Sequence, residues 1–284
     1  MNLTNTDMFD HPSIKDYRKK SFNFIINKKK TPLISIVTIS KNSEKTIEKT
    51  IQSVENQTSK NFEYIIIDSN STDQTISIVK DHIKSVDKFI SESDKNPSDG
   101  INKGISISEG KLIFWLASDD WIDKDLVSIL EDSYYRNKKF SFFYGNMIMH
   151  YTEGQKTIFP KKNNINDLIQ GIPKFPYPAI LFNKEVFLEY GLFSTDIRIN
   201  NDFEFILRIL KKNSKSKYIE KFNVHRLPGG IGEKNKFTNL LETLKINVHY
   251  KTLSINFCMF FLKAIFNFSL VFLKEKIVKK HKKL

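Results

Sequence analysis

The chain has 284 residues, a length sufficient for one large domain or two small ones. Of these residues, 40% are hydrophobic and 27% are charged, a composition typical of soluble globular proteins. Its formal net charge of +13 suggests an anionic partner, but we expect no nucleic acid, because no basic motif interleaved with aromatic residues is present. The single cysteine, Cys258, excludes an intramolecular disulfide and, with a polar N-terminus, leads us to expect a cytoplasmic protein.

The elements expected in chain order alternate between strands and helices. Residues 1–31 are polar and without sustained periodicity, and they predict an extension with at most one short helix. From Pro32 onward, short β-branched runs predict buried strands, and apolar residues at helical spacing predict the helices between them. The expected strands are 33–39, 62–67, 88–91 and 111–116, and the expected helices are 43–54, 76–83 and 97–109.

This alternation predicts an α/β fold with right-handed crossovers and a mostly parallel, Rossmann-like sheet. Ligands of such sheets bind outside the carboxyl ends of the strands. Asp68 ends one expected strand, and the pair Asp119-Asp120 follows another. We therefore expect these carboxylates, far apart in the sequence, to meet at one crevice.

The second half of the chain is less regular. Residues 140–151 are aromatic and strand-like, residues 202–212 predict a helix, and residues 237–248 predict another. We divide the chain into an extension over 1–31, a domain over 32–232 and a helical C-terminal part with a basic tail over 233–284. The domain has a nucleotide-binding half, 32–125, and an acceptor half, 126–232.

A linked series of motifs resembles family 2 glycosyltransferases. The similarity is closest to the branch that builds bacterial capsule, O-antigen and colanic-acid-like polysaccharides. It covers residues 32 to about 125 strongly and extends more weakly to about 232. The motifs are Pro32–Thr38, Ser53–Thr58, Tyr64–Asp73, Asp94-Lys95, Asp99–Gly104 and Leu116–Asp120.

The resemblance implies a GT-A fold and an inverting transfer of sugar from a nucleoside diphosphate. The donor is a UDP-sugar by preference, with GDP- and dTDP-sugars as alternatives, and the acceptor is a glycan or a lipid-linked sugar. A Mg²⁺ or Mn²⁺ ion neutralises the leaving diphosphate, since both ions accept oxygen ligands and bridge phosphates.

The resemblance also implies the roles of individual residues. Asp120 binds the metal and Asp119 accompanies it at the diphosphate. Asp202, in Asn201-Asp202-Phe203-Glu204, is the candidate catalytic base that takes the acceptor proton. The remaining candidates line the donor pocket, with Thr38 and Asp68 at the base and Lys103 at a phosphate; they are Thr38, Asp68, Asp99, Asn102 and Lys103.

Each candidate has an ordinary structural alternative. Asp68 also suits a turn, Asp202 also suits a helix N-cap, and Lys103 also suits the surface. Ala117 stands where the family often has Asp or Asn and offers a metal no ligand. A catalytically silent subunit that binds a nucleotide sugar or a glycan therefore remains the alternative function. A sugar nucleotidyltransferase is disfavoured because residues 40–43 are not a phosphate loop rich in glycine and arginine.

Residues 255–273 are mostly apolar and carry a narrow polar stripe. Asn256, Lys263, Asn267 and Lys274 fall on one helix face at about 100° per residue, and the basic run 274–283 follows. A lysine near the centre disfavours a membrane-spanning helix. We expect a helix that lies on the membrane surface, with a helix buried in the protein or in a dimer interface as the alternative.

Overall fold

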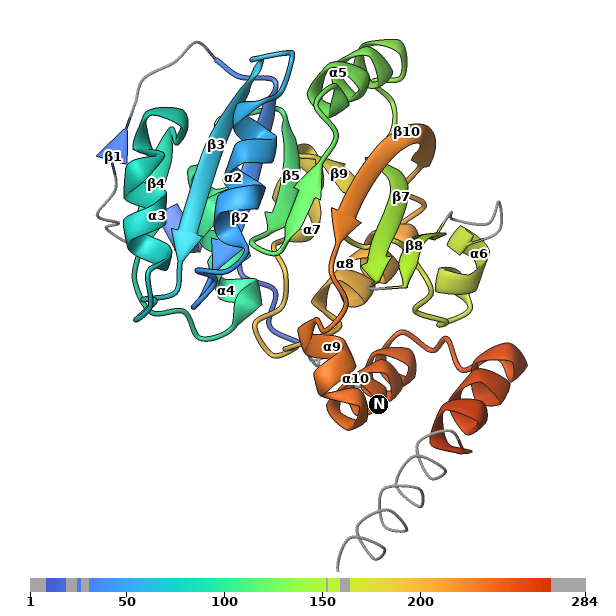
Figure 1. The fold of residues 1–284 in the computed structure, drawn as a ribbon. Helices are drawn as coiled ribbons and strands as arrows, with labels where there is room; N and C mark the ends of the chain where they lie inside the picture. Colours follow the sequence, from blue (N-terminus) through green and yellow to red (C-terminus); the bar gives the residue numbers. More distant parts are fainter. Residues whose placement is uncertain (1–8, 19–24, 27–30, 152, 159–163, 267–284) are drawn as a thin grey trace, which may run out of the picture.

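The computed structural model describes residues 9–18, 25–26, 31–151, 153–158 and 164–266 (Figure 1). Its centre is one curled, 10-stranded mixed sheet in the order β1-β4-β3-β2-β5-β9-β7-β10-β6, with β8 paired to β7. Helices cover both faces of the sheet (Figure 1). The α/β class expected from the sequence is confirmed.

The nucleotide-binding half contains the expected parallel strands. β2 (Ile34–Ser40), β3 (Phe62–Asp68), β4 (Lys88–Ser91) and β5 (Leu112–Ala117) pair in parallel. Because both sheet faces are covered, β2 and β3 are buried along nearly their whole length. The crossovers contain α2 (Ile47–Glu55), α3 (Thr75–Asp81), the short helix Ile83–Ser85 and α4 (Pro97–Ile107).

The second half of the sheet is mixed, whereas the sequence predicted a mostly parallel sheet. Only Ser118 and Asp119 separate β5 from β6 (Asp120–Ile122), and a parallel crossover needs about a dozen residues. β6 therefore does not pair with β5, and it pairs antiparallel with β10 (Ser216–Arg226). β7 (Phe142–Tyr151) runs parallel to β10, while β8 (Gly154–Ile158) and β9 (Ile180–Asn183) pair with β7 antiparallel.

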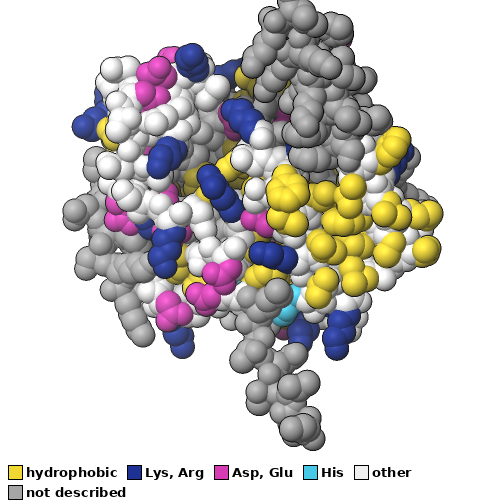
Figure 2. Space-filling model, turned by 90° about the horizontal axis from the view of Figure 1, so that it is seen from below, with side chains coloured by type: hydrophobic (Ala, Val, Ile, Leu, Met, Phe, Trp, Pro, Cys, Tyr) yellow, Lys and Arg dark blue, Asp and Glu magenta, His cyan; other side chains and the backbone are white. Residues whose placement is uncertain are grey.

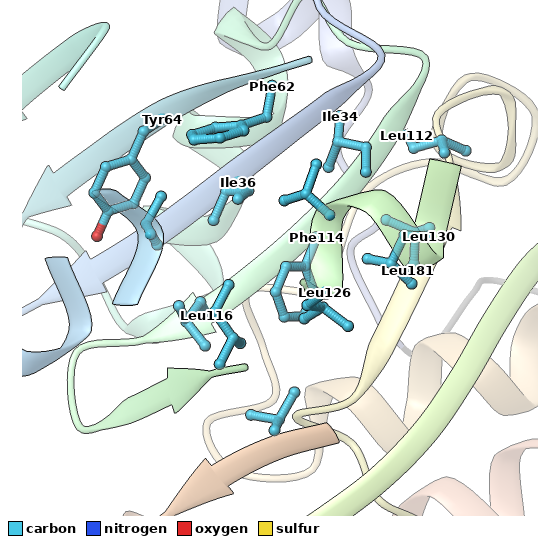
Figure 3. Close-up of a cluster of buried hydrophobic side chains, with 14 of the residues drawn as sticks. Ile34, Ile36, Phe62, Tyr64, Leu112, Phe114, Leu116, Leu126, Leu130 and Leu181 are labelled. Atoms are coloured by element: carbon cyan, nitrogen blue, oxygen red, sulfur yellow. The ribbon is translucent and has the colours of Figure 1, made fainter. Parts of the chain in front are cut away.

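Among the described residues, three hydrophobic clusters hold the helices against the sheet, and two of them are large. In the first, Ile36, Phe114 and Leu116 of the sheet pack with Leu126 and Leu130 of α5 (Leu126–Arg136) (Figure 3). The second core, on the other face, includes residues of α4 and of the acceptor-half helices. These helices are α6 (Asn164–Ile169), α7 (Glu185–Tyr190) and α8 (Asn201–Leu210).

The N-terminal segment is part of the second core. Phe9, Ile14 and Tyr17 are buried there, the last two on α1 (Ile14–Arg18). β1 (Ile25–Ile26) adds a short antiparallel edge strand beside β4. The expected short helix is present, but residues 9–18 pack as part of the domain.

The C-terminal part begins with α9 (Ile231–Lys234) and α10 (Lys236–His249), and residues 255–266 are helical. Residues 267–284, which include part of the expected polar stripe and the basic run, lie outside the described residues. None of the helices in the part of the chain that the structure describes is long and apolar enough to span a bilayer.

Candidate active site

Polar side chains meet at the carboxyl ends of β2, β3 and β4, as the sequence predicted for Asp68. The Asp68 carboxylate is fully buried and accepts hydrogen bonds from Ser40 Oγ at 3.0 Å and Ser71 Oγ at 2.5 Å through Oδ1. Its Oδ2 accepts from Ser71 N at 2.8 Å and Ser91 Oγ at 2.9 Å. Asp68 thus joins three strand ends, and a donor base could bind its carboxylate only by replacing a serine hydroxyl.

Thr38 lies in the interior of β2 and not at the crevice. Its side chain is completely buried, and its hydroxyl accepts a hydrogen bond from the Tyr64 hydroxyl at 3.1 Å. The strand continues for two residues to Ser40, which lies against Asp68. The predicted contact between Thr38 and the base is therefore not supported, and Ser40 occupies the strand end.

Lys103 of α4 is enclosed by carboxylates. Its Nζ lies 2.6 Å from Asp94 Oδ1, 2.7 Å from Glu92 Oε1 and 3.8 Å from Asp99 Oδ2. Burial alone would lower the pKa of Lys103, but the hydrogen bonds that it donates to Asp94 and Glu92 raise it. The ammonium is therefore held as an internal counter-ion, which argues against the predicted phosphate contact.

Asp99 and Asn102 fix α4 to its surroundings. The Asp99 carboxylate accepts from the Tyr17 hydroxyl at 2.5 Å and from Lys95 N at 3.1 Å. The Asn102 amide donates to Phe193 O at 2.8 Å and accepts from Phe193 N at 3.0 Å. Since the Asn102 side chain is also completely buried, its role in the structure is to tie α4 to the segment around Phe193.

Asp120 is a buried carboxylate at the start of β6. Its backbone carbonyl accepts from Thr50 Oγ1 at 2.7 Å, while its side-chain Oδ1 is buried without a hydrogen-bond partner. The Nε of Arg226, which is aligned with Asp120 across the β6–β10 pairing, lies 3.8 Å from that oxygen. Burial raises the pKa of Asp120 to about 8, the charge of Arg226 opposes this shift, and Asp119 adds to it.

Asp202 lies in the first turn of α8, and it too has a buried Oδ1 without a hydrogen-bond partner. Burial raises the pKa of Asp202 to about 7, against the lowering effect of Arg226. The charge of Asp202 in turn adds to the effect of burial in raising the pKa of Tyr177. One arginine therefore acts electrostatically on both the predicted metal ligand, Asp120, and the predicted catalytic base, Asp202.

Arg226 and Tyr177 were not among the residues predicted from the sequence. Arg226 is partly buried at the end of β10, just before Gly229-Gly230. A Cβ on Gly230 would lie 2.6 Å from Arg226 Nη2, so the glycine leaves room for the guanidinium. The glycine pair that follows Arg226 is the sequence feature that could have indicated this position.

Four buried polar atoms around this place have no hydrogen-bond partner: Asp120 Oδ1, Asp202 Oδ1, Arg226 Nε and Tyr177 Oη. Native proteins leave few buried polar atoms unpaired. Arg226 acts on the pKa of both carboxylates and Asp202 acts on that of Tyr177, so these side chains lie within electrostatic range of one another. Such a set of carboxylates, guanidinium and hydroxyl suits a ligand that carries both negative charge and hydroxyl groups.

The site fits a divalent cation shared with a phosphate ligand. Asp120 has an unpartnered oxygen and Asp119 is partly exposed beside it, which gives a hard cation two carboxylates. The described residues contain no group of three or more histidine, cysteine or acidic side chains suited to a metal. Diphosphate oxygens and water would have to complete the coordination, and Ala117 adds nothing to it.

His225 has a structural environment, as expected. Its Nε2 lies 2.8 Å from Asp123 Oδ1, its Nδ1 lies 2.9 Å from His150 Nε2, and its ring stacks on Trp121. Because both ring nitrogens are engaged, His225 orients the end of β10 next to Arg226.

Comparison with known proteins agrees with this geometry. Residues 35–191 match the sequence profile described as Glycosyl transferase family 2, which is more than half of the chain. The chain belongs to this family. The resemblance seen in the sequence is thereby confirmed.

Two curated relatives are similar over most of this family 2 chain. An uncharacterized glycosyltransferase of Haemophilus influenzae is 25% identical over 66% of this chain and 65% of its own length. A GalNAc(5)-diNAcBac-PP-undecaprenol beta-1,3-glucosyltransferase of Campylobacter jejuni is 27% identical over 69% of this chain and 65% of its own length. A chondroitin synthase of Escherichia coli is 31% identical over 45% of this chain but only 19% of its own length. The chain thus spans less than two thirds of each of these relatives.

Solved structures share the fold. S. aureus TarS 1–349 in complex with UDP superposes with a TM-score of 0.58 at 17% identity, over 76% of this chain and 64% of that one. The mannosyltransferase PcManGT from Pyrobaculum calidifontis, in complex with GDP-Man and Mn²⁺, gives 0.60 at 14% identity, over 83% of this chain and 68% of that one. The GT-A fold predicted from the resemblance is therefore confirmed.

Proposed function

We propose that this family 2 chain transfers a sugar, with inversion, from a nucleoside diphosphate to a hydroxyl of a glycan or lipid-linked acceptor in surface-polysaccharide synthesis. The observation that carries the proposal is the set of buried, unpartnered polar atoms on Asp120, Asp202 and Arg226. Charged groups without partners are costly to bury, so their retention in one place favours a ligand that pairs with them.

In the proposed reaction Asp202 accepts the proton of the attacking acceptor hydroxyl. A carboxylate with a pKa of about 7 is half ionised at neutral pH and is a much stronger base than an ordinary aspartate. The hydroxyl then attacks the anomeric carbon from the side opposite the diphosphate, and the bond to the diphosphate breaks. This single displacement inverts the configuration and needs no covalent enzyme intermediate.

Arg226 supports the leaving group in this proposal. Its guanidinium lies near Asp120 and within the electrostatic reach of Asp202, so it can exchange its weak contact at 3.8 Å for a diphosphate oxygen. Asp120 and Asp119 would hold Mg²⁺ or Mn²⁺, which when bound neutralises the charge of the departing diphosphate. Tyr177 offers a buried hydroxyl beside Asp202 for hydrogen bonding to a sugar.

For the donor we favour a UDP-sugar over GDP- and dTDP-sugars. TarS 1–349 was solved with UDP and with UDP-GlcNAc, and PcManGT was solved with GDP-Man and Mn²⁺, which supports a nucleotide-sugar donor and a divalent ion. An undecaprenol-linked acceptor in the name of the Campylobacter relative supports a lipid-linked acceptor. An enzyme acting on such an acceptor would work at the cytoplasmic face of the membrane.

Calorimetric titration with UDP, GDP and dTDP, each with and without Mn²⁺, tests this proposal. We expect one nucleotide to bind tightly only with Mn²⁺ and Asp120→Ala to lose the Mn²⁺-dependent part of the affinity. Asp125→Ala is a matched control, because Asp125 lies near Asp120 in sequence but on the α5 side of β6. Binding that is independent of both Mn²⁺ and Asp120 would contradict the proposed metal site.

One alternative is a catalytically silent subunit that binds a nucleotide sugar or a glycan. Ala117 favours it, because this position at the end of β5 provides no oxygen ligand where the family often does. Such a subunit would bind the donor as above but would not turn it over. Binding and turnover therefore have to be measured separately.

A further inference from the structure

The helices of the C-terminal part expose many apolar side chains and bury several polar ones. On α10, Phe237, Leu241 and Val248 are exposed, whereas the buried positions include Thr243 and Asn247. A helix that packs on a soluble domain usually turns its apolar side inward and its polar side to water. On α10, Thr243 and Asn247 are buried beside Ile246, while three of its apolar side chains face outward.

The inward polar side chains hold α10 firmly on the domain. Asn247 Nδ2 donates to Gly171 O at 3.0 Å, and Asn200 Nδ2 donates to Asn239 O at 2.8 Å. The Glu242 carboxylate accepts the backbone N–H groups of residues 198–200 at 2.9, 2.9 and 3.0 Å. The outward direction of the apolar side is therefore fixed by specific hydrogen bonds.

The helix over residues 255–266 repeats the pattern. Ile255, Met259, Leu262 and Phe266 are exposed at spacings of four, three and four residues, which is one stripe of a helix. At its start, Ser254 Oγ donates to Gln170 O at 3.0 Å and Asn256 Nδ2 donates to Gln170 Oε1 at 2.6 Å. Polar bonds again tie the helix to the domain and leave apolar side chains outside.

These side chains form one surface, which we call the C-terminal apolar face. Figure 2, which views the molecule from below, shows hydrophobic side chains gathered on one side of that view. Exposed apolar groups of this extent mark an interaction site in most soluble proteins. Its members among the described residues are Leu227, Ile231, Phe237, Leu241, Val248, Leu253, Ile255, Met259, Leu262, Ile265 and Phe266.

The charges around the apolar face favour an anionic partner. Exposed lysines lie among its apolar residues at positions 234, 236, 245, 251 and 263. The only carboxylates of residues 227–266, Glu233 and Glu242, both accept backbone hydrogen bonds. A second copy of the chain would bring lysines against lysines, whereas anionic headgroups would pair with them while acyl chains cover the apolar side chains.

The apolar face adjoins the candidate active site. It begins at Leu227, the residue after Arg226, and Glu242 of α10 binds the segment 198–200 that leads directly into α8 and Asp202. We propose that α9, α10 and the helix over 255–266 dock on an anionic lipid surface and so hold the acceptor side of the active site at the headgroups. The evidence for docking is the apolar face itself. The inference that docking positions the acceptor side of the active site rests on the proposed function.

Cys258 provides a probe for this docking without any substitution. It is the single cysteine of the sequence, it is exposed, and it lies on the helix over 255–266. A nitrobenzoxadiazole label on Cys258 of the full chain should increase in fluorescence several-fold with vesicles of phosphatidylcholine and phosphatidylglycerol. The increase should be weaker with phosphatidylcholine alone and should fall with added salt.

Two leucines of equal exposure give a matched pair of variants. Leu262 on the apolar face is 66% exposed and Leu188 on α7 is 65% exposed. We expect Leu262→Glu to lower the vesicle partition coefficient at least about tenfold and Leu188→Glu to leave it unchanged. Phe237→Glu should lower it as well, because α10 shares the surface.

Several outcomes would overturn the docking. These are absence of vesicle binding by the unsubstituted protein, equal effects of Leu262→Glu and Leu188→Glu, or wild-type binding by Phe237→Glu. A label signal that rises with protein concentration without vesicles would assign the apolar face to a second copy instead. Nucleotide affinity measured on the same variants should stay unchanged, so a failure of docking is distinguishable from a failure of the proposed function.

Discussion

Asp120→Asn should stabilise the protein at alkaline pH while it destroys metal-dependent binding. Burial raises the pKa of Asp120 in the folded chain to about 8, against an ordinary value of 3.8. The folded state therefore binds more protons than the unfolded state between these two values, and the free energy of unfolding falls as pH rises through that window. Asparagine resembles the neutral acid and removes this loss.

The size of the effect follows from the linkage relation. Inside the window, each pH unit costs about 1.4 kcal/mol, so the stability advantage of Asp120→Asn should grow by at most about 4 kcal/mol between pH 5 and pH 8. For a chain of this size, 1 kcal/mol corresponds to roughly 2–4 °C in Tm. The Tm difference between Asp120→Asn and the unsubstituted protein should therefore increase by at most roughly 8–16 °C from pH 5 to pH 8.

Thermal unfolding followed by circular dichroism at pH 5 and pH 8, in EDTA, measures this advantage. Asp119→Asn is the control, because Asp119 is a neighbouring carboxylate that is partly exposed. We expect the difference in Tm between Asp120→Asn and the unsubstituted protein to widen toward pH 8. The difference for Asp119→Asn should change much less, because Asp119 only adds to the effect that burial has on the pKa of Asp120. A constant difference for Asp120→Asn would refute the assignment of a buried, poorly solvated carboxylate.

Three further variants test the rest of the site. Asp202→Asn should lower kcat by about 10²–10⁴-fold with donor affinity retained. In the unsubstituted protein we expect kcat/KM to fall below about pH 7, and this variant should not show that fall. Normal turnover would exclude the base role. Arg226→Gln should weaken donor binding and move that acidic limb to higher pH, because Arg226 lowers the pKa of Asp202; an unmoved limb would contradict the coupling. Gly230→Ala should displace the Arg226 guanidinium and reduce kcat/KM several-fold at unchanged Tm, and wild-type kinetics would show that the guanidinium position is unimportant.

The sequence predicted the nucleotide-binding half of the fold well. β2, β3, β4 and β5 lie close to the expected positions, because each is an apolar run bounded by polar turns. The mixed half was not predicted, since pairings such as β6 with β10 join segments about a hundred residues apart. No local pattern specifies such a partner.

The candidate site was predicted in part for the same reason. Asp120 and Asp202 follow from motifs that are contiguous in the sequence, and the structure brings both under the influence of Arg226. Thr38 and Lys103 belong to equally good motifs, yet their polar atoms are engaged inside the protein by Tyr64 and by the acidic residues around Lys103. Whether a polar side chain faces a ligand or an internal partner depends on packing.

The same distinction applies to the C-terminal part. The sequence predicted an amphipathic helix over 255–273, and its described part, residues 255–266, is helical. Its expected polar stripe includes Asn256, whose amide donates a hydrogen bond to Gln170. The exposed apolar side of α10 was not predicted, because periodicity gives a helix two faces without saying which one meets the domain.

The central claim is that the site around Asp120, Asp202 and Arg226 turns over a nucleotide sugar. Its most direct test is the rate of nucleoside diphosphate release from UDP-, GDP- and dTDP-sugars with Mn²⁺, measured on the unsubstituted protein, Asp120→Ala and Asp202→Asn. We predict Mn²⁺-dependent release from one donor that falls at least about a hundredfold in both variants. Tight nucleotide binding without release from any donor, or equal release by all three proteins, would contradict the claim.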